Sequence, residues 1–333
     1  MNILINCPSK FDINNKNKDF LGGIESLNLH LANNLVKKKH KVILSTLCKK
    51  KFKKKKLLNL PVSEVKKNYN KFNFDIIISS NDAKIFNYFP DSKKIFWLHN
   101  QLQIEKSIRK LQFLPLLKNR PNVVFVSNYL HNNTSKLYLF NKKYIIPNFL
   151  LPSFITKKIN FKRKPIFVWS VQRTKGLDKT IDCWINLINP FHKNAKFYIF
   201  GVTKLPPSYN RKFLLRKNIY FIGRIEKKKL KNIYSKSMGM ICLGYDETFC
   251  LNALEANATG LPVVTFGKTA LNELISNNKN GFIVHSYDEL ARKINKIITL
   301  NTAKRTQLIN NTTKFSKKYN LSIIIKKWDN LLN

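Results

Sequence analysis

Acidic residues are scarce in this sequence, which has 18 Asp and Glu against 61 Lys and Arg and a formal net charge of +43 over 333 residues. Such an excess predicts polyanionic partners, namely nucleic acid, an anionic membrane surface or phosphorylated substrates. A compositional interpretation stands beside it, because lysine, asparagine and isoleucine are abundant throughout and both halves of the chain carry a similar excess. The charge alone therefore does not identify the binding partner.

Cysteine and long apolar runs are also in short supply. The five cysteines are odd in number and scattered, without a CxxC pair, so they predict neither a zinc site nor a redox motif and fit a reducing compartment. A run of about 18 apolar residues, as a membrane span needs, is absent, and the N-terminus leads straight into a strand pattern without the apolar region of a signal peptide. We expect a cytoplasmic protein, or one that lies peripherally on the inner face of the cell membrane.

Short apolar runs alternate with helical periodicity along the chain, which is the pattern of parallel sheets. The runs lie at residues 2–6, 41–46, 74–79, 94–99, 122–127 and 144–147, and then at 165–170, 196–201, 218–223, 239–244, 261–266 and 281–285. A chain of this length favours two domains of about 150 residues each. We predict two Rossmann-like domains, residues 1–150 and 151–316, with residues 317–333 forming a helix that packs back on the first.

Two segments are candidates for contact with an anionic surface. The lysine run KKKFKKKK at residues 49–56 is expected to be a solvated loop, because like charges repel, and a lipid or phosphate patch is the alternative. Residues 103–120 mix apolar and basic side chains at helical spacing, and we expect Pro115 to break this helix. A basic amphipathic face suits an anionic leaflet, and an ordinary packed helix fits the pattern equally well.

The most specific segment is YDETFCLNALEANATGLPVV, residues 245–264. Its apolar spacing predicts a helix that starts near Phe249 and ends before Gly260, and such a helix offers free backbone N–H groups to an anion at its N-terminus. Glu247 precedes the helix, and Glu255 is expected about two turns along it. The two carboxylates would bracket a phosphate-sized anion site, whereas the alternative is a helix with two surface glutamates.

This segment, with seven residues between its two glutamates, resembles the signature of the retaining GT-B glycosyltransferases of family four. The resemblance implies an α/β fold of two Rossmann-like domains whose parallel sheets face each other across a cleft. It also implies that Glu247 contacts the sugar of a nucleotide-sugar donor, that Glu255 binds the ribose hydroxyls, and that backbone amides hold the diphosphate. The donor-binding residues implied in this turn are Thr248, Phe249, Cys250 and Leu251.

Two segments of the N-terminal half extend the resemblance. LGGIESLNLHLANNL, residues 21–35, is similar to the family's glycine loop, in which Gly22 and Gly23 let the backbone approach the donor. IFWLHN, residues 95–100, places His99 just beyond a strand, where open α/β sheets bind ligands. His99 matches the family histidine that faces the donor sugar, which implies a catalytic role. The alternatives are an ordinary turn and a structural histidine.

A third segment, FVWSVQRTKGLDKTI at residues 167–181, resembles the strand, loop and helix that supply an arginine and a lysine to the donor diphosphate. Lys175 matches the lysine, to which the resemblance gives a catalytic and donor-binding role. Ser170 stands where the arginine is usual, so Arg173 is the candidate for the second positive charge. A solvent-facing loop is the alternative for both cations.

Two further segments match the family less well, and two motifs of other protein classes are absent or incomplete. Phe149 stands in place of the glycine of a Pro-Asn-Gly hinge, and Glu273 is placed either beside the donor or at a helix N-terminus. The GKT at residues 267–269 is not a P-loop, because Pro262 stands where the first glycine is required. No Asp-x-Asp motif for a divalent metal is present either.

The resemblance thus implies a retaining, metal-independent transferase of the hexosyltransferase type, without a cofactor, in which cations and helix amides stabilise the departing diphosphate. The expected partners are a nucleotide-sugar donor, a glycan or lipid-linked acceptor in cell-surface polysaccharide or lipopolysaccharide synthesis, and an anionic membrane surface. One alternative is a non-catalytic relative that binds sugar nucleotides. A nucleic-acid-binding protein is the other, but no nucleic acid is expected, because aromatic residues do not alternate with the basic clusters as a stacking platform requires.

Overall fold

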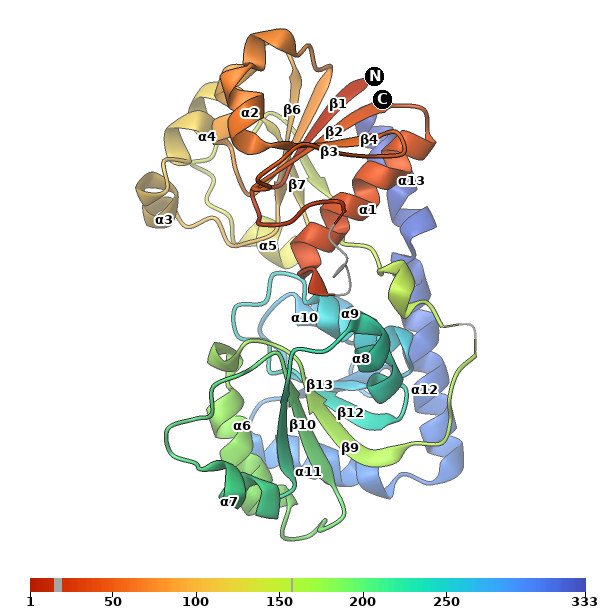
Figure 1. The fold of residues 1–333 in the computed structure, drawn as a ribbon. Coiled ribbons are helices and arrows are strands. Elements are labelled where there is room, and N and C mark those ends of the chain that lie inside the picture. The colour runs from red at the N-terminus through yellow and green to blue at the C-terminus, as the bar shows by residue number, and fades with distance from the viewer. Residues whose placement is uncertain (15–19, 157) are drawn as a thin grey trace. The chain divides into compact units, whose positions relative to one another are not determined.

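The computed structural model describes residues 1–14, 20–156 and 158–333. Its contacts divide the chain into two compact units, one of Met1–Phe149 with Ser322–Asn333 and one of Leu150–Leu321. Each unit is built around its own largely parallel sheet with helices on it (Figure 1), which confirms the predicted α/β fold class. No helix within the described ranges is long and apolar enough to cross a membrane.

The sheet of the first unit has the strand order β3-β4-β2-β1-β5-β6-β7-β8, in which only the β3–β4 pair of the described strands is antiparallel. The strands are β1 (Asn2–Asn6), β2 (Lys41–Thr46), β3 (Phe52–Lys54), β4 (Leu57–Pro61), β5 (Ile76–Ser80), β6 (Lys93–Leu98), β7 (Asn122–Phe125) and β8 (Lys143–Ile145). The central strands β1 and β5 are buried along almost their whole length, as continuous apolar runs in a covered parallel sheet require.

The helices of the first unit include the last helix of the chain. They are α1 (Gly23–Lys37), α2 (Val62–Lys67), α3 (Ile104–Arg109), α4 (Phe113–Asn119), α5 (Asn128–Asn132) and, from Ser322 onward, α13 (Leu321–Leu332). The ring of Trp328 on α13 lies edge-on to that of Trp97 on β6, with centroids 4.8 Å apart. Lys93 Nζ donates a hydrogen bond to the carbonyl of Leu331 at 2.7 Å. The chain's last helix therefore contributes to the core of this unit.

Two expectations for the first unit need correction. The lysine run is not a loop throughout, because Phe52–Lys54 form the edge strand β3, whose lysines are exposed. Charge on an edge strand discourages pairing with other chains, so the run is solvated and still part of the sheet. The helix of residues 103–120 does not break at Pro115, which lies in the first turn of α4, where a missing N–H costs little. It breaks at Leu111, which has a φ of 54°.

The sheet of the second unit has six parallel strands in the order β11-β10-β9-β12-β13-β14. These are β9 (Lys164–Trp169), β10 (Lys196–Phe200), β11 (Ile219–Gly223), β12 (Ser237–Ile241), β13 (Val263–Phe266) and β14 (Gly281–Val284). The strands that follow β9 extend the sheet in one direction, and those that follow β12 extend it in the other. The point between β9 and β12 is therefore the place where the strand order reverses, and open α/β sheets bind ligands at the carboxyl ends of the strands there.

The helices of the second unit connect these strands. They are α6 (Leu177–Cys183), continued by a π-helical turn (Trp184–Ile188), α7 (Arg211–Arg216), α8 (Lys227–Tyr234), α9 (Leu251–Ala258), α10 (Leu271–Leu274), α11 (Tyr287–Thr299) and α12 (Thr302–Ser316). Within this unit α11 packs on α6, and α12 packs on α9 (Figure 1). The loops after β9 and β12 lead into α6 and α9, so the reversal point is followed by two helix N-termini.

Candidate functional site

The loops after β9 and β12 bring a lysine and a glutamate together. Lys175 Nζ lies 3.9 Å from Glu247 Oε1, and their side chains are only 16% and 17% exposed. This separation is that of an ion pair and is longer than a hydrogen bond. Burial raises the pKa of Glu247, and the positive charge of Lys175 opposes that rise. The structure thus places a partly desolvated ion pair at the reversal point of the sheet.

The close packing of the two loops depends on glycine. Gly176, directly after Lys175, has a φ of 99°, and a Cβ at this position would lie 2.7 Å from Tyr245 Cε2. Gly244 has a φ of 81°, and a Cβ there would lie 2.6 Å from a methyl carbon of Leu271. Side chains are excluded at both positions by conformation and by space. The backbone of Glu247 is also held, because its carbonyl accepts a hydrogen bond from the N–H of Ala270 at 3.3 Å.

The helix after Glu247 begins later than the sequence predicted. α9 starts at Leu251, because Cys250 adopts a left-handed φ of 68° and forms the N-cap instead of joining a turn that starts near Phe249. Cys250 Sγ lies 3.6 Å from Cys242 Sγ, and both thiols are buried. The first N–H groups of α9 lack intrahelical partners, as in any helix, and the short turn Thr248–Cys250 separates them from Glu247. Glu255 consequently lies about one turn into α9, not two.

Glu255 is a buried carboxyl group and not the surface glutamate of the alternative interpretation. It is 5% exposed, and burial raises its pKa to about 8, against an opposing effect of Lys227 at the start of α8. A free carboxyl with this pKa is largely protonated at neutral pH. Hydrogen bonds from a ligand's hydroxyl groups favour the ionised form, because a carboxylate accepts them better than a carboxylic acid does.

Arg173, the second candidate cation, forms an ion pair with Asp178. Arg173 donates a hydrogen bond through Nε to Asp178 Oδ1 at 2.8 Å and also forms an ion pair with that carboxylate. Ser170, at the position of the family's arginine, contacts the hydroxyl of Tyr234, and its carbonyl accepts a hydrogen bond from Asn252. The loop after β9 therefore places Lys175 against Glu247, whereas Arg173 pairs within its own loop and helix.

The remaining site candidates belong to the first unit. His99 follows β6 and is 4% exposed, and burial lowers its pKa to about 3, so its ring is neutral at pH 7. Its backbone N–H donates a hydrogen bond to Asn81 Oδ1 at 2.8 Å, and its ring centroid lies 4.5 Å from that of Trp97. Asn81 has a left-handed φ of 56° and was not singled out from the sequence. Asn81 follows β5 and His99 follows β6. Because these two strands are paired, the side chain of Asn81 reaches the backbone of His99, and the sequence alone does not reveal this contact.

In the glycine loop at the start of α1, a side chain lies close against the backbone. Gly22 is the N-cap, Gly23 is the first helical residue, and a Cβ on Gly22 would lie 2.3 Å from Glu25 Oε2. The carboxylate of Glu25 thus covers the space that a side chain would need. Lys227 and Asn252 in the second unit are the other residues that the motifs did not reveal, because their relation to Glu255 and Ser170 exists only in the folded unit.

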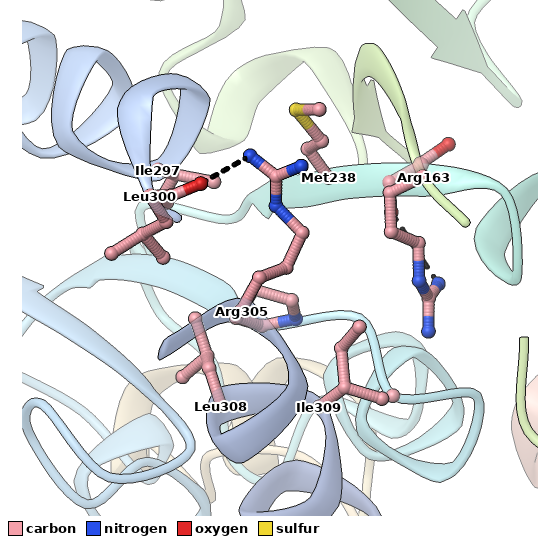
Figure 2. Close-up of a pocket in the computed structure, with 10 residues that line it drawn as sticks. Arg163, Met238, Ile297, Leu300, Arg305, Leu308 and Ile309 are labelled. Carbon is pink, nitrogen blue, oxygen red and sulfur yellow. Dashed lines mark hydrogen bonds between the residues drawn. The ribbon is translucent and has the colours of Figure 1, made fainter. Parts of the chain in front are cut away.

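A small pocket in the second unit is lined by none of these candidates (Figure 2). Arg163 donates hydrogen bonds to the carbonyls of Tyr234 at 3.0 Å and Thr259 at 2.9 Å, and Arg305 donates one to the carbonyl of Leu300 at 3.0 Å. Arg163 and Arg305 thus bind backbone carbonyls near the ends of helices. The space between them has room for about one water molecule. We interpret this pocket as structural.

Comparison with known proteins finds similarity to glycosyltransferases. Residues 153–315 match the family model described as "Glycosyl transferases group 1". An uncharacterized glycosyltransferase of Methanocaldococcus jannaschii is 26% identical over 195 residues, which cover 53% of this chain and 46% of that protein. The chain thus spans about half the length of this curated relative.

Solved structures match over the whole chain. WaaG, a glycosyltransferase involved in lipopolysaccharide biosynthesis, is 15% identical with a TM-score of 0.73, and the match covers 99% of each chain. Anabaena HepE, in complex with UDP and glucose, is 16% identical with a TM-score of 0.71, and the match covers 100% of this chain and 99% of that one. The likeness confirms the predicted GT-B fold.

Proposed function

We propose that this protein is a retaining glycosyltransferase of family four, because residues 153–315 match the family model "Glycosyl transferases group 1" and the chain has the GT-B fold. It transfers a sugar of the hexose type from a nucleoside diphosphate sugar to an acceptor. The observation that carries the proposal is the Lys175–Glu247 pair at the reversal point of the second sheet. A non-catalytic relative that only binds sugar nucleotides is expected to keep Glu255 and to lose Glu247 or Lys175, whereas this chain has all three.

In the proposed reaction, the diphosphate of the donor lies at the N-terminus of α9. Backbone N–H groups of Phe249, Cys250 and Leu251 and the helix dipole favour an anion there. Lys175, which is 3.9 Å from Glu247 and not hydrogen-bonded to it, turns toward the phosphates and stabilises the charge that develops on the leaving group. The lysine and the amides thus take the part that a metal ion plays in other transferases. Glu247 then orients the transferred sugar.

The other candidates receive roles that follow the resemblance. Glu255 accepts hydrogen bonds from the ribose hydroxyls and ionises as it does so. In the first unit, His99 offers the sugar a neutral imidazole, and Gly22 and Gly23, at the start of α1, are proposed to let the backbone approach the donor. Arg173 is proposed as an auxiliary cation that exchanges Asp178 for phosphate when the donor binds.

We propose a glycan or lipid-linked acceptor of cell-surface polysaccharide synthesis and a location on the cytoplasmic face of the membrane. The net charge of +43 supports an anionic surface as partner, and WaaG, which shares the fold, is involved in lipopolysaccharide biosynthesis. Binding to vesicles with anionic lipid is expected to weaken as salt rises, because salt screens the attraction between surface charges beyond a Debye length of about 8 Å at physiological ionic strength. Equal binding to neutral and anionic vesicles would contradict this part of the proposal.

A panel of nucleoside diphosphates tests the donor. UDP, GDP, dTDP and ADP are compared by thermal shift, with UDP first because HepE is seen with it. The correct ligand at a hundredfold excess over its Kd stabilises the fold by about 2.7 kcal/mol. The matching sugar nucleotide is then assayed for transfer, with Lys175→Gln as the negative control. The proposal fails if none of the four diphosphates stabilises the protein.

A further inference from the structure

Helices α3 and α4 and the turn between them hold three large apolar side chains in solvent. Ile108, Leu111 and Leu114 are 55%, 73% and 74% exposed. All three line one groove of the first unit with a volume of about 710 Å³, which is in the size range of pockets for small organic ligands, about 300–1,000 Å³. Exposed apolar side chains gathered at one groove indicate an interaction site, whereas scattered ones do not.

The conformation of Leu111 strengthens this interpretation. Its φ of 54° lies in the left-handed region, which favours glycine or asparagine and costs other residues roughly 1–2 kcal/mol. Its side chain is 73% exposed, so packing in the unit does not offset that cost. Neither backbone conformation nor core burial explains a leucine here. An outlier of this kind points to a ligand that covers the side chain.

The walls of the groove are fastened to each other. Gln112 Oε1 accepts a hydrogen bond from the N–H of Ala83 at 2.6 Å, and Gln112 Nε2 donates one to Asp82 Oδ1 at 3.0 Å. At the other end of α4, Asn119 Nδ2 donates to Asn87 Oδ1 at 2.7 Å. These bonds tie α4 to the 3-10 helix Lys84–Tyr88, which forms the opposite wall. The groove therefore exists before any ligand binds.

Among the described residues that line the groove, lysine is the only charged type. Lys66 and Lys84 both contribute, and Lys66 Nζ lies 5.6 Å from the ring centroid of Tyr88. Within the part of the chain that the structure describes, no acidic residue lines the groove. A purely apolar ligand would leave these cations unused, and a free phosphate would leave the leucines uncovered. An apolar chain with an anionic head satisfies both sets of groups.

We propose that this groove binds the hydrocarbon chain of a lipid-linked acceptor, with a phosphate of that acceptor on Lys66 and Lys84. The identity of the occupant rests on the proposed function, because a lipid-linked acceptor is a substrate of the proposed transfer. The existence of a site for an alkyl phosphate does not rest on it. The groove would select acceptors by the tail, whereas the loops of the second unit handle the donor.

Calorimetric titration of the full chain with decyl phosphate, below its micelle concentration, tests the site. We expect one ligand per chain, no measurable binding of inorganic phosphate, and weaker binding of 1-decanol. Leu114→Ser should lower the affinity for decyl phosphate about tenfold, since a well-covered leucine is lost. Leu137→Ser is the matched control, because Leu137 is 61% exposed in the same unit but does not line the groove.

Further variants separate a binding role from a structural one. Leu111→Gly should raise the Tm, because glycine accepts the left-handed conformation, and should still weaken decyl phosphate binding. The double variant Lys66→Gln/Lys84→Gln should weaken decyl phosphate but leave 1-decanol unchanged. Lys67→Gln, at an exposed lysine of the same helix that does not line the groove, should change neither.

The outcomes that overturn the proposal are distinct from those that overturn the donor chemistry. The site is refuted if Leu114→Ser binds decyl phosphate as well as the unaltered chain does, or if many ligands bind per chain. If Leu114→Ser loses binding to anionic vesicles as strongly as it loses decyl phosphate, the occupant is a membrane phospholipid and not the acceptor. None of these titrations contains a sugar nucleotide, so a failed nucleoside diphosphate panel leaves them unaffected.

Discussion

Lys175 Nζ lies 3.9 Å from Glu247 Oε1, and this contact joins the loops after β9 and β12, two adjacent strands that are distant in the sequence. Each residue alters the other. Lys175 opposes the rise that burial causes in the pKa of the half-buried Glu247 carboxyl, and Glu247 gives the half-buried ammonium group of Lys175 a partner when no ligand is present. Several expectations depend on this pair.

Replacing the cation should affect both rate and pH dependence. Lys175→Gln is expected to lower kcat/KM about a hundredfold, the usual cost of one group that stabilises developing charge. It should also raise the pKa of Glu247 further, because burial then acts without the opposing charge, so the acid limb of the pH profile moves to higher pH. Steady-state kinetics across pH measure both effects. Lys179→Gln, on the exposed side of α6, is the control. If this variant loses as much kcat/KM as Lys175→Gln does, the role assigned to Lys175 is wrong.

The two glutamates should respond differently to removal. Glu255→Ala is expected to weaken the donor and the free nucleoside diphosphate alike, raising KM more than it lowers kcat, because the ribose does not react. Glu247→Ala should lower kcat sharply and change the affinity for the diphosphate little, because the sugar changes at the transition state. Steady-state kinetics of both variants measure kcat and KM, and calorimetric titration measures their affinity for the nucleoside diphosphate. The roles are wrongly assigned if Glu247→Ala loses the diphosphate and keeps kcat.

The buried carboxyl of Glu255 should make stability depend on pH. Its pKa is about 8 in the folded chain and near the ordinary 4.5 in the unfolded chain, so the folded state binds more protons between these values. The contribution of this group to stability is full below about pH 4.5, falls as pH rises, and is lost above about pH 8. Glu255→Gln stays neutral at every pH. The Tm of this variant minus the Tm of the unaltered chain should therefore be several degrees larger at pH 8.5 than at pH 5. Glu105→Gln, at an exposed site, should show no such gain.

Cys250 offers a test of the turn before α9. At its φ of 68° a glycine is unstrained, whereas a β-branched residue is strongly disfavoured. Cys250→Gly should keep the nucleoside diphosphate affinity and lie within about 1 kcal/mol of the original stability, because relief of strain offsets the lost thiol contact with Cys242. Cys250→Val should be less stable than Cys250→Gly by about 2 kcal/mol or more. Denaturant unfolding measures the difference, and equal stability of the two variants would speak against the left-handed turn.

Transfer should persist in excess EDTA at nearly the untreated rate. The reason is that Lys175 and the N-terminus of α9 are proposed to carry the stabilisation of the diphosphate. The assay compares chelator-treated protein with and without added manganese. A complete loss of activity that manganese restores would refute the metal-independent mechanism.

Most of the sheet strands could be predicted from the sequence, because a buried parallel strand is a local run of apolar residues. The apolar runs at residues 2–6 and 41–46 coincide with β1 and β2. β3 was missed, since its lysines contain no apolar signal, and it becomes a strand only by pairing with β4. β4 (Leu57–Pro61) was missed as well, because it follows the lysine run that was predicted to be a loop. The start of α9 was misplaced by two residues, because the spacing of apolar side chains does not reveal a left-handed Cys250.

The sequence by itself determined the alternation that builds two parallel sheets and the spacing of Glu247 and Glu255 around one helix start, because both are local properties of the chain. The tertiary structure alone decided that Lys175 meets Glu247, that Arg173 turns to Asp178, and that Glu255 is buried. These relations depend on which strands are neighbours and on how deeply a helix packs. Strand order and burial arise from the packing of segments far apart in the chain, and local periodicity contains no record of them.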